Sequence, residues 1–324
     1  MLQNFIDSVN IVLPIFLLIV LGFVLKRLNF ASAKFYDDAE KFVFNVALPV
    51  QLFLNVAFDS SLNGGSYGRL IIFCVISVTV AFLLALTLVP LIIKDNAIRG
   101  SVIQNCFRSN FAILGIPLAA NLAGDTGKLL ISILMPFVII MYNVYTVIEM
   151  NIFAPSELKK TPKQLLTSII KSTLTNPLII AVVLALPMLI TGWRPSENFA
   201  FAEKTLDYIS DTTQALVLIA LGAGFSFKSL KGKVKYSLPT SFYKLVVLPV
   251  IAVAVARLVF HFEGVELALI FILFGTPSAV SSYIMAKNLK ADADVASQVL
   301  MITTMFSILT MFLGIFTLKS MNWI

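Results

Sequence analysis

Apolar runs of about 20 residues alternate with short polar segments along the whole chain. A run of that length crosses about 30 Å of hydrocarbon as an α-helix. We therefore expect an all-α membrane protein with ten spans, numbered in chain order: 8–27, 38–57, 69–93, 98–123, 127–151, 173–192, 203–226, 238–261, 265–289 and 294–318. The longest connection, 152–172, is expected to contain a short amphipathic helix along the membrane surface.

Spans 4 and 9 each carry a polar interruption where a membrane helix is normally apolar. The interruptions are Arg108, Ser109 and Asn110 in span 4, and Thr276, Pro277 and Ser278 in span 9. Interrupted helices at matching places in two halves of a membrane protein are typical of a transporter's binding site. We predict that both helices break, cross near the bilayer midplane, and hold the substrate with these six residues. The alternative is that proline only kinks a buried helix.

The broken helices favour an anionic substrate. Each half-helix that starts at a break turns the positive end of its dipole toward the centre, where an anion is stabilised. Asn110 can donate and accept hydrogen bonds, and Arg108 can hold a carboxylate in a two-pronged bond. A structural pairing of Arg108 with an acidic side chain is the competing interpretation. Asn45, in a polar part of span 2, could line the same cavity or serve helix packing.

Further ionisable residues lie within the spans. Asp211 in span 7 is our candidate for coupling to H⁺ or Na⁺, with a structural salt bridge as the alternative. Glu149 closes span 5 and is expected to cap or pair near the cytoplasmic face. Lys244 and Arg257 lie toward the two ends of span 8 and are expected to extend to the membrane surfaces.

Composition supports a membrane protein and excludes several other classes. Hydrophobic residues make up 59% of the 324 residues and charged residues 13%, against about 25% charged in soluble domains. The formal charge of +7 does not indicate nucleic-acid binding, because the basic residues lie in short connections. A single histidine, His261, leaves no histidine-rich metal site or serine–histidine–aspartate triad. With no phosphate-binding loop either, we expect neither an enzyme nor a cofactor.

Lysine and arginine concentrate in the connections that follow spans 1, 3, 5, 7 and 9. Positively charged loops stay in the cytoplasm, so both termini are predicted to lie outside a plasma membrane. Cys74 and Cys106 fall within spans, so no disulfide framework is indicated.

The two halves of the chain repeat. Ala39-Glu40-Lys41 opens span 2 and Ala202-Glu203-Lys204 opens span 7. We predict a first repeat at 1–151, a cytoplasmic connection at 152–172 and a second repeat at 173–324. Five spans per repeat is an odd number, so the second repeat enters the membrane from the opposite side and the repeats are inverted. Chance similarity of apolar segments is the alternative.

Several short motifs follow one another in a recognisable order. They are Leu13-Pro14-Ile15-Phe16 with Leu21-Gly22, Ala47-Leu48-Pro49-Val50-Gln51-Leu52-Phe53, Ser109-Asn110 to Gly115-Ile116-Pro117-Leu118, Asn176-Pro177-Leu178, and Thr276-Pro277-Ser278-Ala279. In these motifs the chain resembles the auxin efflux carrier family, which includes bacterial malate and malonate permeases and the plant PIN carriers. One departure is Ser109, where plant members have proline, and this favours the microbial organic-acid branch.

The resemblance implies a ten-span carrier with crossed, broken spans 4 and 9, similar to bile-acid symporters and NhaA. Spans 1, 2, 6 and 7 would form a scaffold through which the protein dimerises, and spans 3–5 and 8–10 a moving transport unit. Asn110 would match the crossover asparagine and Pro277 the second crossover proline. The expected function is transport of a small organic anion such as malate by an elevator-like movement. Export of auxin-like weak acids, or an uncoupled channel or sensor, are the alternatives.

Overall fold

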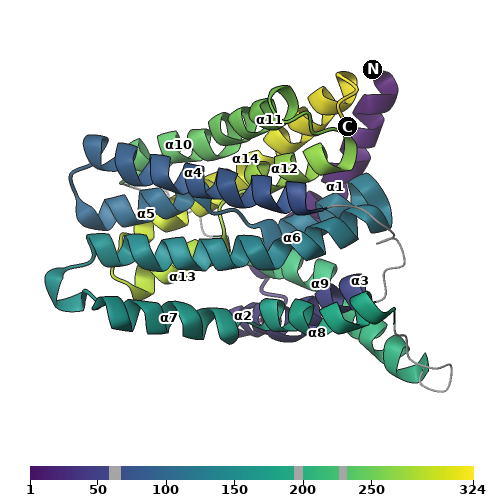
Figure 1. The fold of residues 1–324 in the computed structure, drawn as a ribbon, viewed down its shortest axis with the longest axis horizontal. Coiled ribbons are helices and arrows are strands. Elements are labelled where there is room, and N and C mark those ends of the chain that lie inside the picture. Colours follow the sequence, from purple (N-terminus) through teal and green to yellow (C-terminus); the bar gives the residue numbers. More distant parts are fainter. Residues whose placement is uncertain (58–66, 193–199, 226–231) are drawn as a thin grey trace.

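The fold is entirely helical in the part of the chain that the computed structural model describes, residues 1–57, 67–192, 200–225 and 232–324, which contain no strand. This confirms the all-α prediction. The two termini lie at the same end of the bundle (Figure 1), where Lys319 near the end of the last helix pairs with Asp7 at 3.5 Å. Termini at one end are consistent with an even number of membrane crossings.

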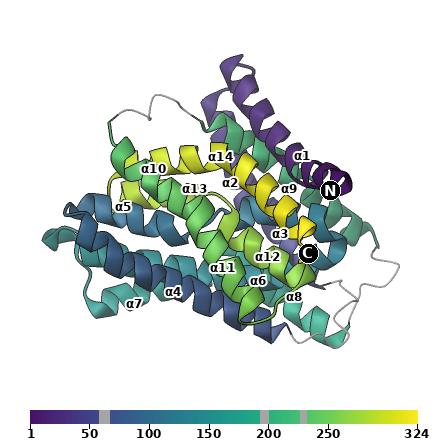
Figure 2. The ribbon, with the colours of Figure 1, turned by 90° about the horizontal axis from the view of Figure 1, so that it is seen from above.

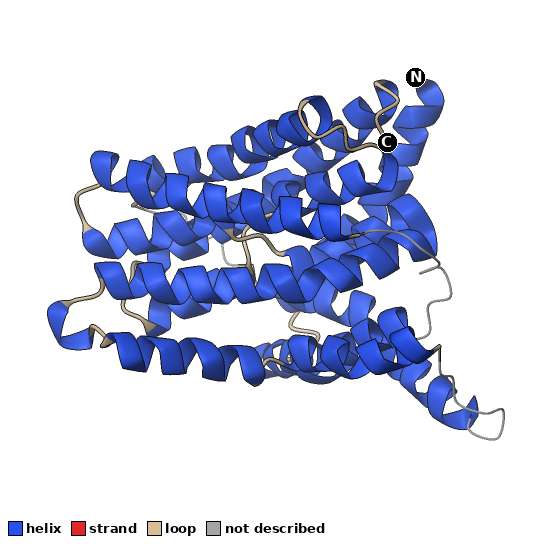
Figure 3. Cartoon of the chain, in the orientation of Figure 1, coloured by secondary structure: helices blue, strands red, loops and turns tan. Residues whose placement is uncertain are grey.

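The helices follow the predicted spans closely. The α-helices are α1 Leu2–Arg27, α2 Ala33–Phe42, α3 Leu48–Ala57, α4 Gly68–Ile92, α5 Asn96–Phe107, α6 Ile116–Phe153, α7 Pro162–Leu174, α8 Pro177–Thr191, α9 Ala200–Ala223, α10 Val234–Phe242, α11 Leu248–Leu258, α12 Gly264–Gly275, α13 Val280–Asn288 and α14 Ala293–Ser320. Wider π-helical turns are Val43–Ala47, Phe111–Gly115 and Tyr243–Val247, and Ser156–Leu158 is a short 3₁₀ turn. Figure 3 shows the same helices with their connecting loops.

By length and apolar composition, six described helical segments can cross a membrane, or seven if the bent pair α7–α8 is one span. One of the six, Asn96–Phe153, has 58 residues and is too long for one crossing. The ten-span topology and the inverted repeats therefore stay predictions. The expected helix in the 152–172 connection exists as α7, and it packs against α6.

Within the 58-residue segment, α6 folds back on itself at Ala123 and Gly124. Gly124 has a φ of 57°, a left-handed conformation that glycine adopts without a steric penalty. A Cβ atom at Gly127 would lie 2.2 Å from the carbonyl oxygen of Ala119, although residues eight apart in a straight helix are about 12 Å apart. The two arms of α6 are therefore antiparallel neighbours, and their turn lies between the predicted spans 4 and 5.

The helices pack most extensively within two groups (Figures 1 and 2). In the first group α1 packs on α9, and α3 packs on α8 and α9. In the second group α4 packs on α5, α10 on α14, and α12 on α6 and α11. Because α1 also packs on α14, the two groups are in contact, and the predicted division into a scaffold and a moving transport unit stays a prediction.

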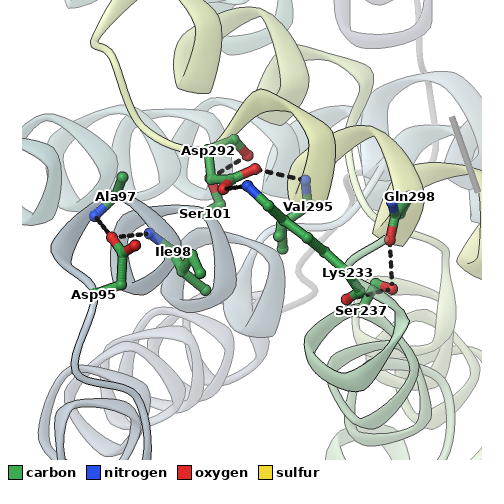
Figure 4. Close-up of polar contacts among 9 residues, drawn as sticks. All are labelled: Asp95, Ala97, Ile98, Ser101, Lys233, Ser237, Asp292, Val295 and Gln298. Atoms are coloured by element: carbon green, nitrogen blue, oxygen red, sulfur yellow. Dashed lines mark hydrogen bonds and ion pairs between the residues drawn. The ribbon is translucent and has the colours of Figure 1, made fainter. Parts of the chain in front are cut away.

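Three helices of the second group begin beside one another (Figure 4). The Asp292 carboxylate caps α14 by accepting the Val295 N–H at 3.0 Å, and it also pairs with Lys233 next to α10. Ser101 of α5 donates to the Asp292 carbonyl at 2.7 Å. The hydrogen bond from the ammonium group to Asp292 raises the pKa of Lys233, so Lys233 stays charged at neutral pH. These contacts fix the starts of α5, α10 and α14 relative to one another.

Candidate functional site

Both predicted helix breaks are present, and they touch. α5 ends at Phe107 and the helix resumes at Phe111, while α12 ends at Gly275 and α13 begins at Val280. The backbone N–H of Asn110 donates to the carbonyl oxygen of Pro277 at 2.7 Å. Proline has no N–H to continue the helical ladder and disfavours helical geometry in the residue before it. The predicted breaks at Ser109-Asn110 and at Pro277 are therefore present and in contact, and their crossing near the bilayer midplane stays a prediction.

The backbone groups that the second break releases find partners on other helices. Pro277 cannot donate to the carbonyl of Leu273, and that carbonyl accepts the hydroxyl of Ser109 instead. Buried backbone groups without partners are costly in a membrane protein, so this exchange makes a non-helical segment tolerable. It also holds the two breaks together through a side chain.

Two further backbone groups at the second break also find hydrogen-bond partners on side chains of other helices. The Phe274 carbonyl accepts the ammonium group of Lys244 at 2.7 Å. The Ser278 N–H donates to the hydroxyl of Thr303 at 3.1 Å, and the Ser278 hydroxyl donates to Asn105. Thr276 lies fully buried in the same segment. Ser278 therefore stabilises the non-helical backbone of the second break in this structure.

A cavity of about 480 Å³ opens where the two breaks meet. Its wall includes the first turns of both half-helices, residues 110–113 and 279–281, together with Arg108, Ser109 and Asn45. The first N–H groups of a helix have no acceptor within the helix, so two helix N-termini face one space. This arrangement favours a negatively charged occupant.

Two strong donors of the cavity wall have no partner. Arg108 and Asn110 are each 4% exposed, and Nε of Arg108 and Nδ2 of Asn110 make no hydrogen bond. The guanidinium group otherwise contacts neutral atoms, namely the hydroxyls of Thr146 at 3.1 Å and Ser281 at 2.8 Å and the sulfur of Met285 at 2.8 Å. Among the described residues no ion pair joins Arg108 to a carboxylate. The structural pairing with an acidic residue, which the sequence left open, is not found.

The structure brings four of the predicted site residues to the cavity and leaves four elsewhere. Arg108, Ser109, Asn110 and Asn45 line the cavity. Thr276, Pro277 and Ser278 lie at the second break but outside the cavity wall. Asp211 is exposed on α9 and does not line the cavity.

The cavity has neighbours that the sequence did not reveal. They include Asp37, Glu40 and Lys41 of α2, Tyr142 and Asn143 of α6, Asn176 before α8, and Ser281 and Met285 of α13. The Tyr142 hydroxyl lies 2.7 Å from the hydroxyl of Ser109. Polar residues inside an apolar run, such as Asn143, are a signal that could have found part of this set. The α2 residues carry no comparable signal because they stand at the polar start of a span.

Two expectations about charged residues near span ends are wrong. Glu149 neither caps nor pairs at the end of its helix, because it is fully buried and both carboxylate oxygens lack a hydrogen bond. Lys244 does not extend to a membrane surface, because it is also fully buried and bonds the carbonyl of Phe274. Arg257 pairs with Glu263 near the end of α11, in keeping with its expected position.

The described residues contain no group of three or more histidine, cysteine, aspartate or glutamate side chains that could hold a metal ion. The two cysteines are free and buried. The polar groups of the cavity wall are the Arg108 guanidinium, amides, hydroxyls and the starts of two half-helices, together with the charged α2 residues Asp37, Glu40 and Lys41.

Broken helices that meet at a polar cavity inside an apolar bundle define the class of membrane transport proteins. The chain belongs to the membrane transport protein family, whose model matches residues 7–315. It is similar to an uncharacterized transporter of Methanocaldococcus jannaschii, with 23% identity over 305 residues that cover 93% of this chain and 95% of that protein. An uncharacterized transporter of Methanothermobacter thermautotrophicus is 22% identical over 308 residues, which cover 95% and 97% of the two chains. The auxin efflux carrier-like resemblance is thus confirmed at the level of the family.

Proposed function

We propose that this transporter is a secondary carrier of small organic anions, in particular dicarboxylates such as malate. The observation that carries the proposal is the cavity wall, where two half-helices begin and where Arg108 and Asn110 each hold a buried donor without a partner. A carboxylate supplies acceptors for these donors and a negative charge for both helix ends. A volume of about 480 Å³ is ample for a small dicarboxylate.

Transport proceeds by alternating access around the crossed breaks. Spans 3–5 and 8–10 form the moving unit, and spans 1, 2, 6 and 7 form a scaffold through which two copies dimerise. Arg108, Ser109, Asn110 and Asn45 contact the anion, while Thr276, Pro277 and Ser278 position the second half-helix. The protein lies in the plasma membrane with both termini outside, and transport is driven by H⁺ or Na⁺.

The alternatives are less well supported by the same residues. An exporter of auxin-like weak acids is favoured if Arg108 faces lipid or cytoplasm and an apolar pocket lies at Phe111 and Tyr283. Arg108 instead lines the cavity, and Tyr283 does not. An uncoupled anion channel or sensor needs no moving unit, and a conductance measured in planar bilayers would support it.

The decisive variant is Asn110→Ala. It leaves the backbone bond to Pro277 in place and removes only the side-chain amide of this cavity-lining residue. A lost hydrogen bond to a charged ligand is worth about 1.5–3 kcal/mol, so affinity for malate should fall roughly 10- to 100-fold. Binding to the purified protein and uptake into proteoliposomes, across a panel of organic acids with imposed H⁺ or Na⁺ gradients, give the two measurements.

Asn10→Ala is the matched control, because Asn10 is exposed on α1 and does not line the cavity. It should leave affinity unchanged. Equal affinity of the Asn110→Ala variant and the wild type for every transported anion would remove the proposed site. Absence of transport for all anions in the panel would contradict the proposed substrate class.

A further inference from the structure

Glu149 is a buried carboxyl group for which the proposed transport path has no use. It lies on the long arm of α6, one turn beyond Thr146, and is fully buried. Neither of its oxygens accepts or donates a hydrogen bond. An ionised carboxylate in such a place costs several kcal/mol, because it loses water without gaining a partner. The group is therefore neutral in this structure and carries a proton.

The cation that interacts with Glu149 is Arg108, which also lines the cavity. Arg108 donates through one nitrogen to Thr146, at 3.1 Å, on the same face of α6 as Glu149. It interacts electrostatically with Glu149, although the two form no ion pair. Arg108 thus lines the cavity and also interacts with Glu149.

Other titratable groups around Glu149 are few. From α5 the neighbour is Cys106, a buried thiol, and Lys244 faces Cys106 from the π-helical turn Tyr243–Val247. On α6 itself Tyr142 faces Arg108. Arg108 is the charged side chain that acts on Glu149, and it lowers the cost of ionising this carboxyl group.

We infer that Glu149 is the proton-binding site that couples anion binding to H⁺, acting through Arg108. This inference rests on the proposed organic-anion carrier and adds its coupling residue. With Glu149 protonated, the full charge of Arg108 is available to an anion in the cavity. When Glu149 releases its proton, the carboxylate neutralises Arg108 and the cavity loses affinity for the anion.

Binding and protonation are therefore reciprocal, since two sites that affect one another do so by the same factor. The protein binds one proton at Glu149 and one anion at Arg108 together, and it releases both together. The only bond that forms and breaks is the O–H bond of the Glu149 carboxyl group, whose proton is taken up from and returned to water. The carrier thus moves an anion together with a proton.

The test compares Glu149→Gln with Asp211→Asn, which neutralises the coupling residue suggested by the sequence. Gln has nearly the shape of protonated Glu and cannot release a proton. Malate is the probe, between about pH 6.5 and 9, where its carboxyl groups are ionised. Wild-type affinity should fall by about tenfold or more as pH rises, and the Glu149→Gln variant should keep the high-affinity value throughout. In proteoliposomes this variant should exchange malate across the membrane but fail to accumulate it under a pH gradient.

Each alternative outcome has a distinct meaning. If the affinity for malate still depends on pH in Glu149→Gln but not in Asp211→Asn, then Asp211 is the coupling residue and the inference is overturned. A folded Glu149→Gln variant that cannot bind malate at low pH also overturns it. If the variant does not fold, the test is whether the wild type takes up a proton when it binds malate, measured with an indicator dye. Absence of proton uptake at every pH refutes the inference. Failure of the wild type to bind any organic anion contradicts the proposed function itself.

Discussion

At the scale of single residues, the most informative feature is the environment of Arg108. Its guanidinium is 4% exposed, bonds only neutral groups among the described residues, and leaves Nε without a partner. A charge at the centre of a membrane costs roughly 2.5 kcal/mol or more, and a structural role would be served better by a carboxylate partner. An organic anion in the cavity, as proposed above, would supply a negative charge to Arg108.

Arg108→Lys tests this explanation. Lysine keeps the charge but lacks the planar fork that grips a carboxylate with two parallel bonds. Losing one such bond should weaken malate binding roughly 10- to 100-fold, with little change in its pH dependence. Binding measured by calorimetry gives the affinity. Arg99→Lys is the control, because Arg99 bonds carbonyl groups between α4 and α5 and does not line the cavity. Unchanged affinity in Arg108→Lys would show that the fork does not contact the anion.

The residues of the site were predictable from the sequence to different degrees. Arg108 and Asn110 stand out because they interrupt an apolar run, and the structure places both at the cavity. Glu149 and Lys244 lie close to span ends in the sequence, so their side chains were expected near the membrane surfaces. Both are buried because neighbouring helices cover them, and such coverage depends on tertiary packing that no local pattern records.

At the scale of elements, three helices widen into π-helical turns just before a proline. The turns Val43–Ala47, Phe111–Gly115 and Tyr243–Val247 precede Pro49, Pro117 and Pro249 by two residues. A proline ring clashes with the carbonyl four residues earlier and removes one hydrogen bond, and a wider turn relieves both effects. Proline is not sufficient, since Pro14 and Pro136 lie inside ordinary α-helix. The sequence therefore indicated the polar interruptions but not the wider turns.

The crossing of α1 and α9 depends on two glycines that face each other's helices. A Cβ at Gly22 would lie 2.0 Å from the carbonyl oxygen of Ile219, and one at Gly222 would lie 1.8 Å from that of Ile19. Small residues allow such close backbone contact between membrane helices. The contact is reciprocal, because each glycine lies against the backbone of the other helix. A larger side chain at either position would meet backbone atoms, which cannot move aside.

Gly222→Leu should therefore force α1 and α9 apart. The larger side chain meets backbone atoms, which cannot move as a flexible side chain can, so we expect a loss of about 1–3 kcal/mol or more. The melting temperature of the detergent-solubilised protein should fall measurably, and any dimer formed through this group of helices should weaken. Gly68→Ala is the control, because nothing lies within 4 Å of a Cβ at that position. Equal melting temperatures for Gly222→Leu and the wild type would contradict the close crossing.

At the scale of the whole molecule, the cavity lies between the two groups of helices. One part of its wall, including Asp37 and Asn45, belongs to the segment of α2 and the following π-helical turn. The opposite part, including Arg108, Asn110 and Ser281, belongs to the two breaks. A relative movement of the groups would close one entrance and open another while the donors stay with the breaks. The sequence predicted the two groups through a family resemblance, but it contained no information on which entrance is open.

The open entrance can be identified with a single cysteine at Asn45, a residue that is exposed and lines the cavity. The region before span 2 is predicted to be cytoplasmic, so a membrane-impermeant thiol reagent should label Asn45→Cys in inside-out vesicles and not in right-side-out vesicles. Malate should slow the labelling by occupying the cavity. Cys74 and Cys106 are buried and add little background.

Leu184→Cys is the control for exposure to lipid rather than to water. Leu184 is 61% exposed on the apolar helix α8, but a thiol in hydrocarbon does not ionise, and the thiolate is the reactive form. It should resist the reagent in both vesicle preparations. Labelling of Asn45→Cys from the outer side alone would reverse the predicted orientation. Absence of labelling from both sides would mean that the cavity is closed to water, and the state described here would then be occluded rather than open to the cytoplasm.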